Sequence, residues 1–92
     1  TKLQDADKNV AIGRSALTSD TLGSKSTALG YSALDAQNFT TATDSHNTAV
    51  GHLSLSSNTE GLENTGLGRS ALFTNTTGDN NVAVGFEALK TE

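Results

Sequence analysis

Side chains that could support catalysis or metal binding are scattered along this chain instead of being grouped. The sequence contains ten Asp and Glu residues, two His residues and no Cys. The absence of Cys excludes a thiolate nucleophile, a disulfide framework and a Cys-ligated zinc site. His46 and His52 are six residues apart, which is not the spacing of two metal ligands on one element. The sequence therefore predicts no metal site and no cofactor.

The carboxylates and hydroxyls likewise form no catalytic pattern. No column of paired carboxylates, the arrangement that cleaves glycosidic bonds, recurs along the chain. Ser15, Ser32 and Ser70 recur at one place in a repeated phrase, so we interpret them as structural, and no Ser-His-Asp arrangement accompanies them. We expect a protein that is not an enzyme and has no catalytic residues.

One set of chemically versatile side chains does recur with a regular spacing. Each member directly follows a glycine, and the set, called here the variable stripe, consists of Arg14, Tyr31, His52, Arg69 and Phe86. Arg and Tyr are enriched in binding hot spots, and aromatic rings offer large flat surfaces to sugars and other rings. The stripe is therefore a candidate contact for a host-surface receptor or a glycan. Alternatively, its side chains cover grooves between chains and add stem area to an oligomer.

These residues belong to a nine-residue phrase that occurs five times. The copies are NVAIGRSAL (9–17), STALGYSAL (26–34), NTAVGHLSL (47–55), NTGLGRSAL (64–72) and NVAVGFEAL (81–89). Their central residues, the anchor glycines, are Gly13, Gly30, Gly51, Gly68 and Gly85, at spacings of 17, 21, 17 and 17. A fixed period of about 20 indicates a solenoid, in which successive repeats stack on one another.

The repeat predicts short strands and tight turns instead of helices. Too few ordered residues separate the glycines and the Asn/Thr clusters for a packed helix, whereas Val, Ile and Thr before the anchor glycine favour strand. Ten residues after the anchor lies a turn column, Gly23, Gly61 and Gly78, whose place Asp44 takes in the second unit. Gly, Asn and Asp tolerate left-handed backbone, so we expect a tight turn at this column.

We therefore predict an all-β fold, a parallel β-roll (β-solenoid) of about five 17-residue coils, each with two short strands and two turns. Residues 1–8 form a lead-in and residues 9–92 form the roll. Stacking places equivalent residues above one another. The column expected to form a polar ladder is Asn9, Ser26, Asn47, Asn64 and Asn81. A side chain on an anchor glycine would strike the neighbouring coil or chain.

Both faces of the strand before the anchor glycine are apolar. Side chains alternate along a strand. The small face carries Ala11, Ala28, Ala49, Gly66 and Ala83, and the aliphatic face carries Ile12, Leu29, Val50, Leu67 and Val84. A strand that is apolar on both sides is buried on both sides. One face can fill the interior of the roll, and the other then needs a partner, so we expect an obligate oligomer.

The second unit carries an insertion of four residues within DAQNFTTATDSH (35–46). Extra residues in a solenoid form a bulge on one face, which is often the binding face. Phe39 is the large apolar residue of this polar stretch. Two interpretations stay open: Phe39 belongs to an exposed contact loop, or it packs back into a local gap or onto a neighbouring chain.

Charge and hydropathy exclude two classes of partner. The net charge of −4 comes from scattered residues, and no basic patch indicates nucleic-acid binding. The sequence has no basic amphipathic face, which would indicate binding to a membrane surface. It also has no apolar run of about 20 residues, which would indicate a membrane-spanning helix. The chain begins TKLQDADKN, without an initiator Met or a signal peptide, and we interpret it as a piece of a longer polypeptide.

The repeated phrases resemble a known family. NVAIG, STALG, NTAVG and NVAVG, each followed by a similar ending, resemble the head repeats of YadA-like trimeric autotransporter adhesins. NTTGDNNVAVGFEAL (75–89) is still more similar to the NTAVGxxAL…NTTG repeats of phage tail fibres and related bacterial proteins. The resemblance covers residues 9–89. It implies a left-handed roll, a homotrimer of three chains side by side around a threefold axis, and attachment at an extracellular, cell-surface or virion location. The 17-residue period is longer than that of adhesin heads and favours the tail-fibre branch.

Two rival functions need features that the sequence lacks. An ice-binding solenoid needs a flat Thr-x-Thr array, but here the residue two positions after each member of the outward Thr column is aliphatic. That column is Val10, Thr27, Thr48, Thr65 and Val82. A polysaccharide-cleaving solenoid needs a cluster of carboxylates, although a site shared between chains stays open. The predicted function is a structural and adhesive segment of a trimeric surface fibre.

Overall fold

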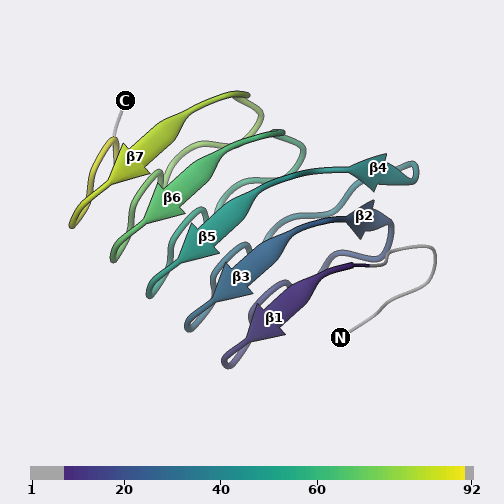
Figure 1. Cartoon of the computed structure of the whole chain (residues 1–92), viewed down its shortest axis with the longest axis horizontal. Coiled ribbons are helices and arrows are strands. Elements are labelled where there is room, and N and C mark those ends of the chain that lie inside the picture. The colour runs from purple at the N-terminus through teal and green to yellow at the C-terminus, as the bar shows by residue number, and fades with distance from the viewer. Residues whose placement is uncertain (1–7, 91–92) are drawn as a thin grey trace.

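The computed structural model describes residues 8–90, and within them the chain forms strands and turns without a helix. Five three-residue strands form one parallel sheet, and two shorter strands form a second sheet beside it (Figure 1). In sheet order the first five are β1 (Val10–Ile12), β3 (Thr27–Leu29), β5 (Thr48–Val50), β6 (Thr65–Leu67) and β7 (Val82–Val84). The short pair is β2 (Gly23–Ser24) and β4 (Thr43–Asp44).

The strands stack with equivalent residues of the repeat directly opposite one another. Ala11 pairs with Ala28, Ala28 with Ala49, Ala49 with Gly66 and Gly66 with Ala83. This register confirms that the repeat is a β-solenoid in which each coil lies on the preceding one, although it has about four turns and not the predicted five. The predicted lead-in falls outside the described residues except for Lys8, and residues 91–92 of the predicted roll also fall outside them.

The small face of the strands points into the solenoid. Ala28, Ala49 and Ala83 are buried, together with a column of four leucines that follows the anchor glycines. These leucines are Leu17, Leu34, Leu55 and Leu72. An ideal Cβ on Gly66 would lie 3.4 Å from the Leu55 Cγ and 2.8 Å from the Ser54 Oγ. The leucines and Ser54 thus fill the interior opposite the strand and leave space there for small side chains.

The turns of each coil use left-handed backbone at regular positions. The anchor glycines have φ between 122° and 131°. The second and fourth residues after each anchor have φ between 52° and 64°, and they are Ser15, Leu17, Ser32, Leu34, Leu53, Leu55, Ser70, Leu72, Glu87 and Leu89. Each non-glycine residue in this region costs about 1–2 kcal/mol. The hydrogen bonds between coils must therefore hold these residues in place.

Left-handed backbone is not what requires glycine at the turn column, since Gly23, Gly61 and Gly78 are not among the glycines with positive φ. Close approach selects glycine at this column instead. A Cβ on Gly78 would lie 2.5 Å from the Asn75 Oδ1, and a Cβ on Gly61 would collide with the Gly78 carbonyl oxygen. A side chain at either position would displace the neighbouring amide or coil.

The second strand of each coil also differs from expectation, because it forms in the first two coils only. β4 pairs with β2 so that Thr43, and not Asp44, lies opposite Gly23. The insertion adds a residue between β4 and the Asn column, which shifts the pairing by one position. In the later coils, isolated backbone hydrogen bonds take the place of this second pair of strands. One of them runs from the Glu63 N–H to the Ser45 carbonyl (2.8 Å).

Candidate functional site

The predicted polar ladder exists, and it fastens each coil to the next through backbone groups. The Asn47 Oδ1 accepts a hydrogen bond from the backbone N–H of Asn64 (2.9 Å), and the Asn64 Oδ1 accepts one from Asn81 (3.0 Å). The side-chain amide of Asn47 donates to the Gly61 carbonyl, and that of Asn64 donates to the Gly78 carbonyl, both at 2.7 Å. Each Asn side chain therefore satisfies two backbone groups, in buried bonds at Asn47 and in partly buried bonds at Asn64. Without the Asn side chains these groups would lack partners.

The second coil has Ser26 in place of this Asn, and Gln37 fills the gap. The Gln37 Nε2 donates to the Ser26 Oγ (2.8 Å), and the Gln37 Oε1 accepts from the Asn47 Nδ2 (2.7 Å). The Nε2 also donates to the buried carboxylate of Asp20 (3.0 Å), which accepts from Gly23 N–H as well. The Asp20 and Gln37 side chains belong to a second polar column that the repeat pattern did not predict, formed by Asp20, Gln37, Asn58 and Asn75. Its signal was a carboxylate or amide at the seventh position after each anchor glycine.

The insertion folds back onto the coil instead of presenting Phe39 to solvent. The Phe39 side chain is 6 % exposed, and its Cδ2 would lie 2.7 Å from a Cβ on Gly23. The Phe39 backbone N–H donates to the Asp20 Oδ1 (3.4 Å). Of the two interpretations left open by the sequence, packing into a local gap is therefore the one that the structure supports. Phe39 is not part of the exposed surface considered below.

The outward face of the five-stranded sheet is an exposed aliphatic surface, called here the aliphatic face. Ile12, Leu29, Leu67 and Val84 on this face are 41 to 64 % exposed. Val10 and Val82 flank them at the two ends of the sheet and are exposed as well. These strands lie side by side (Figure 1). Because they pair in register, equivalent side chains form continuous columns along the solenoid. Val50, in the middle of the column, is half-buried, and the other four side chains stay exposed in the described part of the chain.

The variable stripe lies just beyond the anchor glycines, and the structure brings its members together. All five side chains are exposed. The rings of Tyr31 and His52 meet edge to face with centroids 5.0 Å apart, and the Arg69 guanidinium lies 5.6 Å from the centre of the Phe86 ring. Each of these pairs joins adjacent coils. The expectation of one side chain per coil along a single line is therefore confirmed, whereas its binding role stays a prediction.

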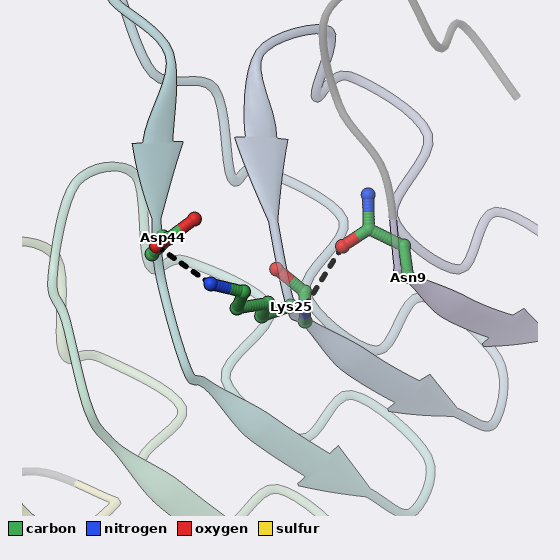
Figure 2. Close-up of polar contacts among 4 residues, drawn as sticks. Asn9, Lys25 and Asp44 are labelled. Atoms are coloured by element: carbon green, nitrogen blue, oxygen red, sulfur yellow. Dashed lines mark hydrogen bonds and ion pairs between the residues drawn. The ribbon is translucent and has the colours of Figure 1, made fainter.

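An exposed ion pair links the first two coils at the other end of the strands. The Lys25 Nζ lies 2.8 Å from the Asp44 Oδ2, and beside it the Asn9 Oδ1 accepts from the Ser26 backbone N–H (2.8 Å; Figure 2). The hydrogen bond from Lys25 is the main cause that lowers the pKa of Asp44 below its usual 3.8. Desolvation opposes this effect, and the positive charge of Lys25 adds to it.

This ion pair predicts a small, pH-dependent contribution to stability. Because the folded-state pKa of Asp44 is lowered, the contribution is present above the unfolded pKa and is lost as the pH falls through the folded one. Asp44→Asn should therefore lower the melting temperature slightly at about pH 6, and the difference from wild type should shrink towards about pH 2. Lys25→Gln, which removes the other partner, should show the same convergence. A difference that stays constant down to about pH 2 would contradict this assignment.

Residues 8–90 contain no pocket and no group of three His, Asp or Glu side chains placed to hold a metal ion. The same described residues include no helix long and apolar enough to cross a membrane. Comparison with known proteins adds no relative, because no family model, curated protein or solved structure matches the chain. Its candidate functional features are therefore two surfaces, the aliphatic face and the variable stripe.

Proposed function

We propose that this chain is a structural and adhesive segment of a homotrimeric surface fibre, which attaches to a host cell or surface from a cell-surface or virion location. The observation that carries the proposal is the aliphatic face. Single exposed apolar residues are normal on proteins, but continuous exposed apolar surfaces mark sites of association. Here the apolar columns run over all five strands of the main sheet.

The geometry of the aliphatic face favours association with further copies of the same chain. Leu29, Val50 and Leu67 stand in one column, each opposite the next. A copy placed alongside, coil beside coil, meets side chains of the same kind at every level. Such contacts close into a ring by rotational symmetry. The resemblance of the repeats to adhesin heads and tail fibres supports three copies and a left-handed coil.

A fibre follows from the same arrangement. Each coil of a solenoid contacts only its neighbours, so the stack grows in one direction and keeps its cross-section. Parallel copies that share the aliphatic face then form a rod, with the aliphatic columns inside and the remaining surface outside. A rod of this kind holds whatever its outer side chains bind at a distance from the surface that carries it.

The oligomeric state tests the proposal. The chain should have a mass of three times 9.4 kDa, or about 28 kDa, by light scattering. Leu67→Lys should dissociate this assembly, because three ammonium groups would be buried without partners at a cost of several kcal/mol each. Thr77→Lys adds the same charge at an exposed turn and should leave the mass unchanged.

Two results would overturn the proposal in different ways. A mass near 9.4 kDa together with cooperative unfolding would show that the single chain is stable and that the aliphatic face has no copy as its partner. A stable dimer that Leu67→Lys dissociates would keep the face as the interface and reject the threefold arrangement.

A further inference from the structure

The variable stripe combines rings and guanidinium groups along one line. Tyr31 and Phe86 are 45 % and 66 % exposed, so the rings keep free surface despite their contacts with His52 and Arg69. The line spans four steps between coils, which is roughly 19 Å at the spacing of neighbouring strands. It is one side chain wide and crosses no pocket among the described residues.

Charge is unevenly distributed around each coil. The stripe contains two arginines and no acidic residue. Beside the stripe, Glu87 forms an ion pair with Lys90 (3.1 Å). Four exposed acids instead lie at the other end of the strands, in β4 and in the turn segments that lead into the strands (Figure 1). They are Asp44, Glu60, Glu63 and Asp79. Although the net charge is −4, the end of the coil that carries the stripe can therefore attract anions locally.

We propose that the variable stripe binds an anionic polysaccharide that lies along the axis of the solenoid. Arg14 and Arg69 pair with acidic groups of the polymer, since a guanidinium presents a planar set of donors that matches carboxylate and sulfate oxygens. The rings of Tyr31 and Phe86 pack against its sugars. The inference rests on the proposed adhesive role and names the ligand class of that role.

The dimensions of the stripe favour this ligand over two other macromolecules. A specific protein partner needs about 800 Å² on each side, which a line one side chain wide does not offer. Single-stranded nucleic acid carries a charge about every 3.4 Å, whereas Arg14 and Arg69 are three coils apart, roughly 14 Å. Arg14 and Arg69 are widely spaced cations, and the rings of Tyr31 and His52 lie between them. This arrangement suits a polymer in which charged units alternate with uncharged units.

Binding of the full chain to immobilised hyaluronate, which carries one carboxylate on every second sugar, tests the inference. Neutral dextran and single-stranded oligothymidine serve as comparison ligands. Hyaluronate should bind, dextran should not, and the bound fraction should fall as salt screens the charges. Replacing both arginines (Arg14→Gln with Arg69→Gln) should weaken binding about tenfold, as should Tyr31→Ala with Phe86→Ala.

A matched control separates the stripe from the overall charge. Lys8→Gln with Lys25→Gln changes the net charge from −4 to −6, as the arginine pair does, but at the other end of the strands. This control should bind within about twofold of wild type. Unchanged binding in the arginine variant, equal loss in both variants, equal binding of dextran, or tighter binding of oligothymidine would each overturn the inference.

Light scattering on the same samples distinguishes failure of the stripe from failure of the fibre. A trimer that does not bind hyaluronate rejects the stripe alone, because the assembly stands without it. A monomer that binds hyaluronate through the stripe rejects the trimeric fibre and keeps the ligand assignment. Circular dichroism of every variant shows that the exposed substitutions leave the solenoid folded.

Discussion

Gly51→Ala should destabilise the solenoid by about 2–6 kcal/mol. An ideal Cβ on Gly51 would lie 2.6 Å from the carbonyl oxygen and 2.7 Å from the carbonyl carbon of Gly68, and 3.2 Å from the Arg69 nitrogen. All three are backbone atoms of the next coil, which cannot move without breaking the stack. The overpacking costs about 1–3 kcal/mol, and a methyl group at a φ of +131° costs about 1–3 kcal/mol more.

Gly85→Ala is the matched control for this substitution. Gly85 has nearly the same φ, +130°, but among the described residues the nearest atom to its added Cβ is the Ala88 Cβ at 3.9 Å. Only the backbone strain should remain, so the loss should be about 1–3 kcal/mol. Urea unfolding at one protein concentration measures both variants, because assembly makes stability depend on concentration. Equal losses would show that the collision between coils contributes nothing.

The second large effect is expected at the Asn ladder. Asn64→Ala removes the donor to the Gly78 carbonyl and the acceptor for the Asn81 N–H in one step. Asn64 is fully buried, and each backbone group that it leaves without a partner costs about 1–3 kcal/mol, so the total should be about 2–6 kcal/mol. The loss should appear as a lower urea midpoint with an unchanged slope, since the surface exposed on unfolding stays nearly the same.

Asn9→Ala removes the same kinds of bond at the edge of the solenoid. The Asn9 side chain donates to the Gly23 carbonyl (2.9 Å) and accepts from the Ser26 N–H (2.8 Å), yet Asn9 itself is only half-buried. Gly23 and Ser26 are themselves buried, but removal of the half-buried Asn9 side chain opens a space that water can enter, and this water replaces the lost bonds. We expect a loss of about 1 kcal/mol or less. A loss at Asn9 as large as that at Asn64 would mean that burial does not set the strength of the ladder.

The repetition in the sequence was enough to predict the stack and its columns. When one phrase recurs at a fixed period, every copy experiences the same surroundings, so the local pattern and the global arrangement agree. The register of Ala28 with Ala49, the ladder through Asn47 and Asn64, and the contact of Tyr31 with His52 all follow from this repetition. The need for glycine at the anchors follows too, because stacked turns approach each other closely.

Only the tertiary structure decided which apolar face lies inside. Alternation along the strand places Ala49 and Val50 on opposite faces, but it cannot show which face lies inside the solenoid, since both residues are apolar. Which face lies inside depends on residues elsewhere in the coil. Leu55 and its buried equivalents have left-handed backbone, point inward and fill the interior. The space left beside them accepts a methyl group and not an isopropyl group, so the aliphatic column is placed outside.

The placement of the side chains in the second unit, which contains the insertion, likewise depends on the tertiary structure. It is set by contacts between residues that belong to different columns of the repeat. Gln37 reaches Ser26 and Asn47 across the interior because its side chain is one methylene longer than the Asn it replaces. Phe39 is buried because it covers Gly23, whose missing side chain leaves room for the ring. The repeat aligns Gln37 with Asn58 and Asn75 but does not show which residues of other columns it contacts, and it does not show what Phe39 covers. Its placement depends on shape and hydrogen bonding that exist only once neighbouring coils have stacked.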